Sequence, residues 1–411
     1  MLEVAAACLV VTALLAYVNH RFVGLPTTIG VMVIALGLSL LLITLNAFGL
    51  AFRLREEAEA LLTSIDFSMV LMQGMLSLLL FAGALHVNLG GLRTYRWQVG
   101  ALAIFGTAAS AAAVAMLLWF LLPFAGVPLT LSACLLFGAL ISPTDPIAVM
   151  GILKSAGAPH NLELVIAGES LFNDGVGLVI FLLVLGIATS GETPTFAQGA
   201  KMLMLEAGGG LVFGLALGYA TFRLLRSVDQ YQVEVMLTLA AVLGGYALAG
   251  HLHVSGPLAM VAAGLVIGNQ GRDLAMSDTT RRHVDLFWEL LDEILNAVLF
   301  VLIGLEVIVI HFPKGVAIAA VVAVPVVVLA RWLTVGLPVE LLRGAFRLPE
   351  GAGTVLTWGG LRGGISVALA LSLPASRERD VLIALTYCVV VFSILGQGLT
   401  IGRAVRRFVH E

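Results

Sequence analysis

Charged residues are scarce in this chain of 411 residues. Asp, Glu, Lys and Arg together make up 11% of it, whereas a soluble domain carries about 25%. Hydrophobic residues account for 60%, and the mean hydropathy is +1.05. This composition excludes a water-soluble globular protein and indicates an all-α polytopic membrane protein. The net charge of −3 provides no basic surface of the kind that binds nucleic acid, so no nucleic-acid partner is expected.

Cysteine is also rare. Cys8, Cys134 and Cys388 lie far apart inside apolar stretches, without the spacing of metal ligands. Such residues serve as small hydrophobic side chains, so neither a disulfide nor a resident metal is predicted, and no cofactor is expected. The N-terminus lacks a basic segment before its first apolar run. Residues 2–19 are therefore expected to form a membrane helix and not a removed signal.

What the chain does contain is long apolar runs. A transmembrane helix needs about 20 predominantly apolar residues. Thirteen segments are long enough, namely 2–19, 27–45, 66–88, 97–122, 130–153, 160–189, 198–227, 231–250, 255–271, 282–310, 314–341, 351–374 and 380–404. The connections are too short for a soluble domain, so residues 1–411 are expected to form a single membrane domain. The amphipathic run 53–62 is expected to be a surface helix.

The distribution of Lys and Arg predicts the orientation. Fourteen of these residues fall in the odd-numbered connections and the C-terminal tail, and six fall in the even-numbered connections. Cytoplasmic connections carry the excess of positive charge. The C-terminus is therefore predicted to be cytoplasmic and the N-terminus outside, in a multi-pass protein of the cell membrane.

The thirteen spans divide into a first half of six, one linker span and a second half of six. Because a single span separates the halves, they have opposite orientations in the membrane. In inverted repeats of this kind, the substrate binds near the midplane at discontinuous helices in corresponding positions. The fifth span of each proposed half is interrupted, the first by Pro143 and Pro146 and the second by four glycines that flank Leu361 and Arg362. Irregular backbone at membrane depth is viable only where it lines protein or water. The two discontinuous helices are therefore expected to cross at a common cavity.

Carboxylates lie inside the spans around the first break. A charge at the bilayer centre costs roughly 2.5–3.5 kcal/mol on insertion scales, and intramembrane acids usually mark an ion or proton pathway. The side chains of Asp145, Asp174, Thr144 and Ser170, with a backbone carbonyl, offer the several oxygen ligands that a small hard cation takes. The pattern predicts a membrane ion carrier with its site at these residues.

Two basic residues, Arg331 and Arg362, also fall inside spans and need partners. We predict a structural ion pair between Arg362 and Glu169, and an acid or a backbone carbonyl as the partner of Arg331. Burial disfavours the charged form of a carboxyl group. An acid without a permanent partner, for which Asp174 is the candidate, can therefore hold either a proton or a cation. That competition is an exchange mechanism by itself.

A second polar stretch lies at 287–300, where Glu289 and Asn296 are seven residues apart. The two side chains can share the inward face of a helix. We favour the alternative that they belong to a solvated turn at the membrane interface.

The chain resembles the sodium/proton exchangers of the NhaP/NHE type, within the monovalent cation–proton antiporter superfamily. The matching blocks are FAGALHVNL (81–89), LLFGALISPTDPIAVMGILK (135–154), GESLFNDGVGLVIF (168–181), FWELLDEILNAVLFVLIGLE (287–306) and WGGLRGGISVALAL (358–371). The GESLFNDG and GGLRGGIS blocks are highly specific.

The resemblance implies thirteen helices in two inverted six-helix repeats and a homodimer. It divides the chain into an ion-translocating core, at 97–189 and 314–404, and a linker and dimerisation part, at 1–88 and 198–310. It makes Asp174 the carboxylate that binds the cation and the proton. Thr144, Asp145 and Ser170 become further ligands or supports, Asn173 becomes a helper near the site, and Glu169 pairs with Arg362. Asn173 in place of a second acid points to electroneutral exchange of H⁺ for a monovalent cation, Na⁺ or Li⁺.

Alternatives remain at this stage. A K⁺-preferring antiporter and a cation-coupled solute symporter would use the same broken helices and the same ligand types. An intramembrane aspartyl protease also needs two buried aspartates, but the chain has no GxGD motif, and Asp145 is held between Thr144 and Pro146. A channel would need a continuous pore. We therefore expect a transporter and not an enzyme.

Overall fold

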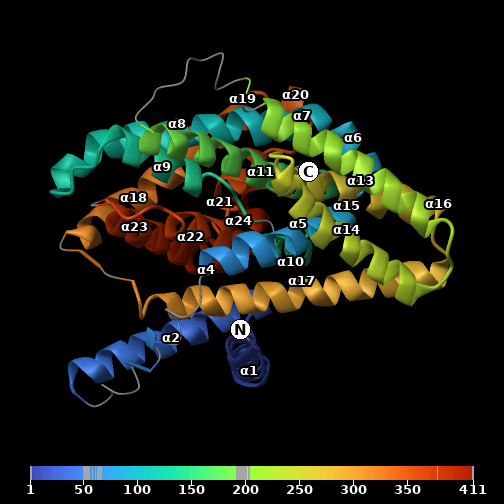
Figure 1. The fold of residues 1–411 in the computed structure, drawn as a ribbon. Coiled ribbons are helices and arrows are strands. Elements are labelled where there is room, and N and C mark those ends of the chain that lie inside the picture. The colour runs from blue at the N-terminus through green and yellow to red at the C-terminus, as the bar shows by residue number, and fades with distance from the viewer. Residues whose placement is uncertain are drawn as a thin grey trace.

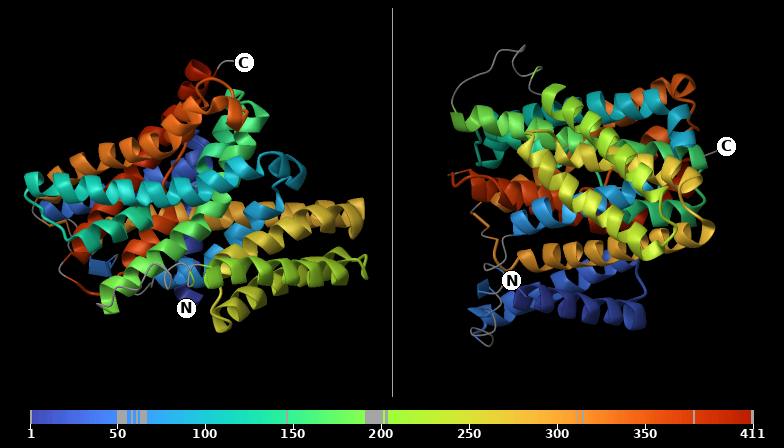
Figure 2. Two further views of the ribbon diagram at one scale, coloured as in Figure 1. Left: turned by 90° about the horizontal axis from the view of Figure 1, so that it is seen from above. Right: turned by 45° about the vertical axis from the view of Figure 1, so that its right-hand side comes forward.

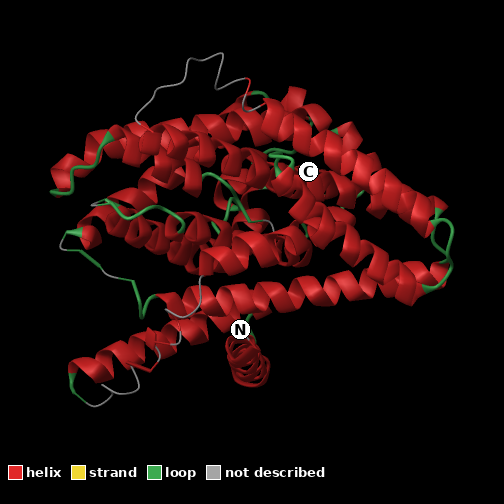
Figure 3. Cartoon of the chain, in the orientation of Figure 1, coloured by secondary structure: helices red, strands yellow, loops and turns green. Residues whose placement is uncertain are grey.

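The computed structural model consists of helices and their connections, and its described part contains no β-strand (Figure 3). The described residues are 2–49, 56–57, 59–60, 62, 67–145, 147–190, 201, 204–310, 312–313, 315–376 and 378–409. Pro146 and most of the predicted surface helix 53–62 lie outside them. The predicted all-α membrane architecture is confirmed.

The helices of the first part of the chain run up to Ser190. A segment named η is a π-helical or 3-10 stretch. The bounds are α1 Leu2–Val18, η1 Asn19–Val23, α2 Thr27–Ala47, α4 Phe67–Met69, η2 Val70–Met75, α5 Leu76–Leu85, α6 Leu89–Thr94, α7 Arg96–Ala101, η3 Leu102–Gly106, α8 Thr107–Leu121, η4 Leu122–Ala125, α9 Leu131–Ile141, α10 Ile147–Ala156 and α11 His160–Ser190.

The helices of the second part of the chain begin at Met204. The bounds are η5 Met204–Gly208, α13 Gly209–Leu225, α14 Tyr231–His251, α15 Gly256–Val266, η6 Ile267–Gly271, α16 Arg272–Leu274, α17 Asp278–Glu306, α18 Val316–Arg331, η7 Trp332–Gly336, α19 Leu337–Leu341, α20 Arg343–Phe346, α21 Ala352–Trp358, α22 Gly364–Leu371, α23 Arg379–Phe392, η8 Ser393–Gly398 and α24 Leu399–Phe408.

Eight helical stretches of the described chain are long and apolar enough to cross a membrane. They are Ala6–Val23, Thr27–Ala47, Arg96–Ala125, His160–Thr189, Met204–Leu225, Tyr231–His251, Val316–Leu341 and Arg379–Phe408. Each remaining predicted segment coincides with a shorter helix, with a helix that carries more charge, or with a pair of half-helices. The chain is thus a multi-pass membrane protein, and the count of thirteen spans stays a prediction.

The long helices lie side by side in a bundle, with α17 along one edge and α1 and α2 beyond it (Figures 1 and 2). Close contact between α2 and α17 depends on Gly304, because a Cβ there would lie 2.6 Å from the Cβ of Ala35. The hydroxyl of Ser39 donates a hydrogen bond to the Gly304 carbonyl at 3.0 Å. Small residues and interhelical hydrogen bonds of this kind hold helices together where lipid removes the hydrophobic drive.

Two spans are each divided into half-helices. The first break separates α9, which ends at Ile141, from α10, and the second separates α21, which ends at Trp358, from α22. Pro143 has no N–H and cannot continue a helix. In the second break a Cβ on Gly360 would lie 2.1 Å from Nε of Arg331, so only glycine fits against that side chain.

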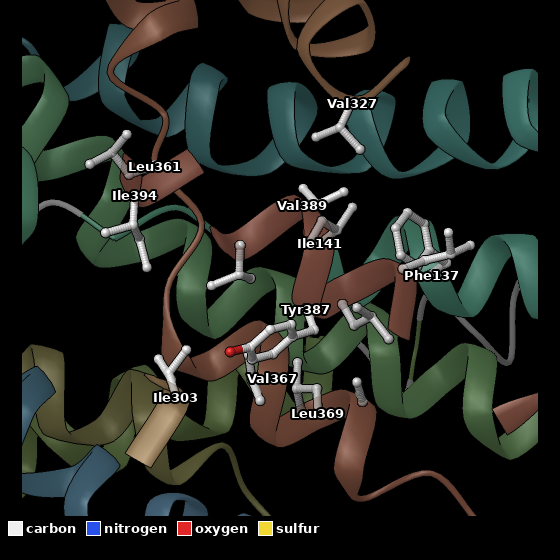
Figure 4. Packing of buried hydrophobic residues seen from close by; sticks show 14 of the residues in the cluster. Phe137, Ile141, Ile303, Val327, Leu361, Val367, Leu369, Tyr387, Val389 and Ile394 are labelled. Carbon is white, nitrogen blue, oxygen red and sulfur yellow. The ribbon is translucent and has the colours of Figure 1, made fainter. Parts of the chain in front are cut away.

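Apolar side chains pack the half-helices into the core of the bundle. The large hydrophobic cluster includes Phe137 and Ile141 from α9, Val367 from α22, and Tyr387 and Val389 from α23 (Figure 4). Burial of this kind is what positions the two breaks, because each half-helix is too short to be held by its own backbone hydrogen bonds.

Candidate functional site

The two breaks lie against each other. The backbone N–H of Asp145 in the first break donates a hydrogen bond to the carbonyl of Leu361 in the second, at 2.8 Å. A Cβ on Gly363 would lie 2.5 Å from Oδ2 of Asp145, so the absence of a side chain there makes room for the carboxylate. The expected crossing of the discontinuous helices is therefore present.

A cavity of about 70 Å³ opens at this crossing. Its polar lining comes from Thr144, Asp145, Asp174, Asn296 and Ser366. Leucines of α5 form an apolar wall, and Gly363 and Gly364 contribute the second break. A water molecule needs roughly 10–15 Å³ of such volume, so the cavity has room for a small cation with part of its hydration.

Two carboxylates share this cavity. Asp174, on α11, is 8% exposed, and Asp145 is half-buried in the first break. Within the described residues, the Asp174 carboxylate has neither a hydrogen-bond donor nor an ion-pair partner. Two carboxylates around one small cavity repel each other when both are ionised. A proton or a cation bound between them relieves that repulsion.

Behind the cavity, Thr144 is held by side chains of α11. Its hydroxyl lies 2.9 Å from the Ser170 hydroxyl and accepts a hydrogen bond from Nδ2 of Asn173 at 2.7 Å. The Thr144 backbone N–H donates to Oδ1 of Asn173 at 3.2 Å. Ser170 and Asn173 are therefore placed next to the site through Thr144, and α11 fixes the backbone of the first break.

Glu169 has a different partner from the predicted Arg362. Its carboxylate accepts two hydrogen bonds from Arg331 of α18, at 3.0 and 2.8 Å, and Nε of Arg331 donates to the Leu356 carbonyl at 3.1 Å. Glu169 is 1% exposed and Arg331 is 4% exposed. Arg331 thus has both kinds of partner that the sequence suggested for it, an acid and a carbonyl.

The predicted Glu169–Arg362 pair fails because carbonyl groups engage Arg362. Its guanidinium donates to the carbonyls of Ser142 and Pro143, the latter at 3.0 Å. Those carbonyls lie where α9 ends and have lost their helical donors. A cation at this end also interacts favourably with the helix dipole. Arg362 is therefore the C-terminal cap of a half-helix.

Two residues of the cavity were not identified from the sequence. Asn296 was assigned to a solvated interfacial turn, but it is 1% exposed and lines the cavity, whereas Glu289 is exposed as expected. Ser366 of α22 also lines the cavity, and its hydroxyl has no hydrogen-bond partner among the described residues. A small polar residue just after the glycine break was the available indication for Ser366.

Comparison with known proteins assigns the family. The model of the family described as "Sodium/hydrogen exchanger, transmembrane" matches residues 10–407. The Na(+)/H(+) antiporter NhaP of Pseudomonas aeruginosa is 55% identical over 411 residues, which cover 99% of this chain and 97% of that protein. The Na(+)/H(+) antiporter NhaH of Halobacillus dabanensis is 35% identical over 362 residues and 86% of each chain.

A solved structure shows the same fold. The sodium proton antiporter MjNhaP1 from Methanocaldococcus jannaschii at pH 8 superimposes with a TM-score of 0.76 at 19% sequence identity, over 99% of this chain and 98% of that one. The family match and the shared fold agree with the crossed half-helices and the acidic cavity. The chain belongs to the sodium/hydrogen exchanger family.

Proposed function

We propose that this protein exchanges Na⁺ for H⁺ across a membrane. The observation that carries the proposal is the Asp174 carboxylate, which faces a small cavity at the crossing of two broken helices and lacks a partner among the described residues. The names of the relatives, Na(+)/H(+) antiporters, support the same activity.

In this mechanism a proton and a cation compete for Asp174. The deprotonated carboxylate binds Na⁺ together with Asp145, and Thr144 supplies a hydroxyl oxygen of the type that hard cations take. Ser170 supports the Thr144 hydroxyl from behind the cavity. Asn173 holds Thr144 in place through its two hydrogen bonds. When Asp174 is protonated, the negative charge that attracts the cation falls, and the cation leaves.

The exchange is proposed to be electroneutral. Arg331 compensates the charge of the Glu169 carboxylate through two hydrogen bonds. Asn173 carries no charge in either state. Titration of Asp174 alone then exchanges one proton for one cation, and the loaded site has the same charge in both directions.

Alternating access completes the proposal. The core at 97–189 and 314–404 moves against the part at 1–88 and 198–310, which forms a homodimer in the cell membrane with the C-terminus in the cytoplasm. The tie between the two breaks, from Asp145 to Leu361, supports movement of the core as one body.

Proteoliposomes with an imposed pH gradient test the function. Addition of Na⁺ is expected to collapse the gradient, Li⁺ to act similarly and K⁺ to have little effect, with or without a clamp on the membrane potential. Asp174→Asn should reduce the rate at least 100-fold, the scale of losing an essential proton-transfer group. Glu289→Gln, which removes an exposed acid of α17, serves as the matched control and should transport normally.

Each of the other transport results would contradict one part of the proposed function. Activity with K⁺ alone would overturn the substrate, and a rate that changes with the clamp would overturn electroneutrality. Cation-dependent proton flux in Asp174→Asn would overturn the mechanism.

A further inference from the structure

Two hollows adjoin on the surface around α7. One, of about 600 Å³, is lined by Arg93, Arg96, Trp97, Arg347 and their neighbours. The other, of about 990 Å³, is also lined by Arg93 and Arg96 but is otherwise largely apolar. We call them the basic hollow and the apolar crevice. Because they share two arginines, the two hollows are neighbours, one charged and one largely apolar.

The basic hollow gathers three cations. Arg93, Arg96 and Arg347 are exposed, and among the described residues none of the three pairs with a carboxylate. Arg96 lies over the Trp97 ring, 5.8 Å from its centroid. All three arginines fall in connections that the charge bias assigns to the cytoplasmic side. Positive charge without acidic partners at that surface suits an anionic group.

Side-chain hydrogen bonds to backbone carbonyls hold the segment around α20 against α7 and α11. Nε2 of Gln98 donates a weak hydrogen bond to the Ala345 carbonyl at 3.4 Å, and Nδ2 of Asn161 donates to the Arg347 carbonyl at 3.2 Å. The Gln98 contact and the shared lining of the basic hollow place the residues around α20 beside α6 and α7 (Figure 1). The arginines of the two segments therefore surround one space.

The apolar crevice runs between two groups of helices. One wall comes from α7, η3 and α11, with Val99 and Val176, and the other from α13 and α15, with Leu211 and Leu258. Gly100 also lines the crevice, and a Cβ built on it would meet no atom within 4 Å. The volume lies near the upper end of about 300–1,000 Å³ seen for small-molecule sites.

We propose that this space binds one anionic phospholipid, with its phosphate in the basic hollow and acyl chain in the apolar crevice. Charge complementarity selects an anionic head group, and the apolar lining of the crevice selects a lipid over a soluble anion. Trp97 is 77% exposed, as befits an aromatic side chain at the level of the head groups. The lipid bridges Arg93 and Arg96 to Arg347, which lies far away in the sequence.

Binding can be measured without transport, so its failure is distinguishable from failure of the exchange activity. The full-length protein in a neutral detergent is titrated with phosphatidylglycerol, phosphatidylcholine or inorganic phosphate. Bound lipid is counted by native mass spectrometry, and the unfolding temperature is recorded. Phosphatidylglycerol is expected to bind and to raise the unfolding temperature, whereas the other two probes are expected to do neither.

Substitutions locate the site. Arg93→Gln and Arg347→Gln should each weaken phosphatidylglycerol binding about fivefold, the effect of one basic side chain near an anionic surface. Arg226→Gln removes an exposed arginine away from both hollows and should bind like the unmodified protein. Gly100→Leu keeps every charge but fills part of the apolar crevice, and it should also weaken binding.

The proposal is overturned if phosphatidylcholine or inorganic phosphate stabilises the protein as well as phosphatidylglycerol does. It is overturned equally if the two arginine variants bind as tightly as Arg226→Gln. Unchanged binding in Gly100→Leu, with an unfolding temperature equal to that of the unmodified protein without lipid, would overturn the placement of the acyl chain.

Discussion

The same helix, α11, carries two buried carboxylates in contrasting surroundings. Glu169 belongs to a sealed network in which Arg331 and Asn173 donate three hydrogen bonds to its oxygens. Asp174, just over one turn further on, faces a cavity. An acid whose charge is permanent is neutralised by a bidentate arginine. An acid whose charge must change faces a space that a proton or a cation can enter.

The largest expected effect is on stability. Substitution of Glu169 should lower the free energy of unfolding much more than substitution of Asp174. Glu169→Gln leaves Arg331 buried without its counter-charge and should lower the free energy of unfolding by about 3–5 kcal/mol. Asp174→Asn removes a carboxylate that no described residue stabilises, so it should cost less than about 1 kcal/mol. Reversible unfolding in detergent measures both. Similar losses of free energy of unfolding in the two variants would contradict the assignment of Glu169 to a stabilising ion pair and of Asp174 to a site without a partner among the described residues.

A double-mutant cycle sharpens the assignment of the arginines. Glu169→Gln and Arg331→Gln should be strongly non-additive, with a coupling energy near about 3 kcal/mol, the upper end for residues in one buried network. Glu169→Gln and Arg362→Gln should couple by less than about 1 kcal/mol, because the hydrogen bonds of Arg362 go to backbone carbonyls. Stronger coupling to Arg362 would restore the pair expected from the sequence.

Two glycine substitutions are expected to have the smallest effects on stability. Gly360→Ala would place a Cβ against the Arg331 guanidinium and should cost about 1–3 kcal/mol through overpacking. Gly37→Ala, on the exposed side of α2 with no atom within 4 Å of a new Cβ, should be neutral or stabilise the protein by up to about 1 kcal/mol. The unfolding temperature should therefore fall for Gly360→Ala and stay the same or rise for Gly37→Ala. An unchanged value for Gly360→Ala would show that the break is looser than described.

Much of the fold followed from local sequence properties. Apolar length identifies the helices, and Pro143 and the glycines around Arg362 identify the breaks, because the physical cause in each case lies within a few residues. The cluster of Asp145 and Asp174 was likewise predictable, since an acid inside an apolar run needs a cavity or a partner.

The partner of Glu169 was not predictable in this way. Arg331 and Arg362 are both buried arginines, and only the packing of α18 against the site decides which one reaches the carboxylate. The position of Asn296 was likewise not predictable from the local sequence. Its acidic neighbours, Asp292 and Glu293, indicated a solvated surface, but of these two only Glu293 is exposed. Asp292 is half-buried and lies four residues before Asn296, on the same face of α17 that carries Asn296 into the cavity.

The hydrogen bonds between the two breaks impose an order on biogenesis. Arg362 donates to Ser142 across 220 residues of sequence. A first half that enters the bilayer alone has no donors for the carbonyls at the end of α9 and no acceptor for the Asp145 amide, and each unsatisfied group costs several kcal/mol there. The nascent chain therefore needs water or the insertion machinery around the first break until α22 arrives. The ion site is among the last parts of the protein to form.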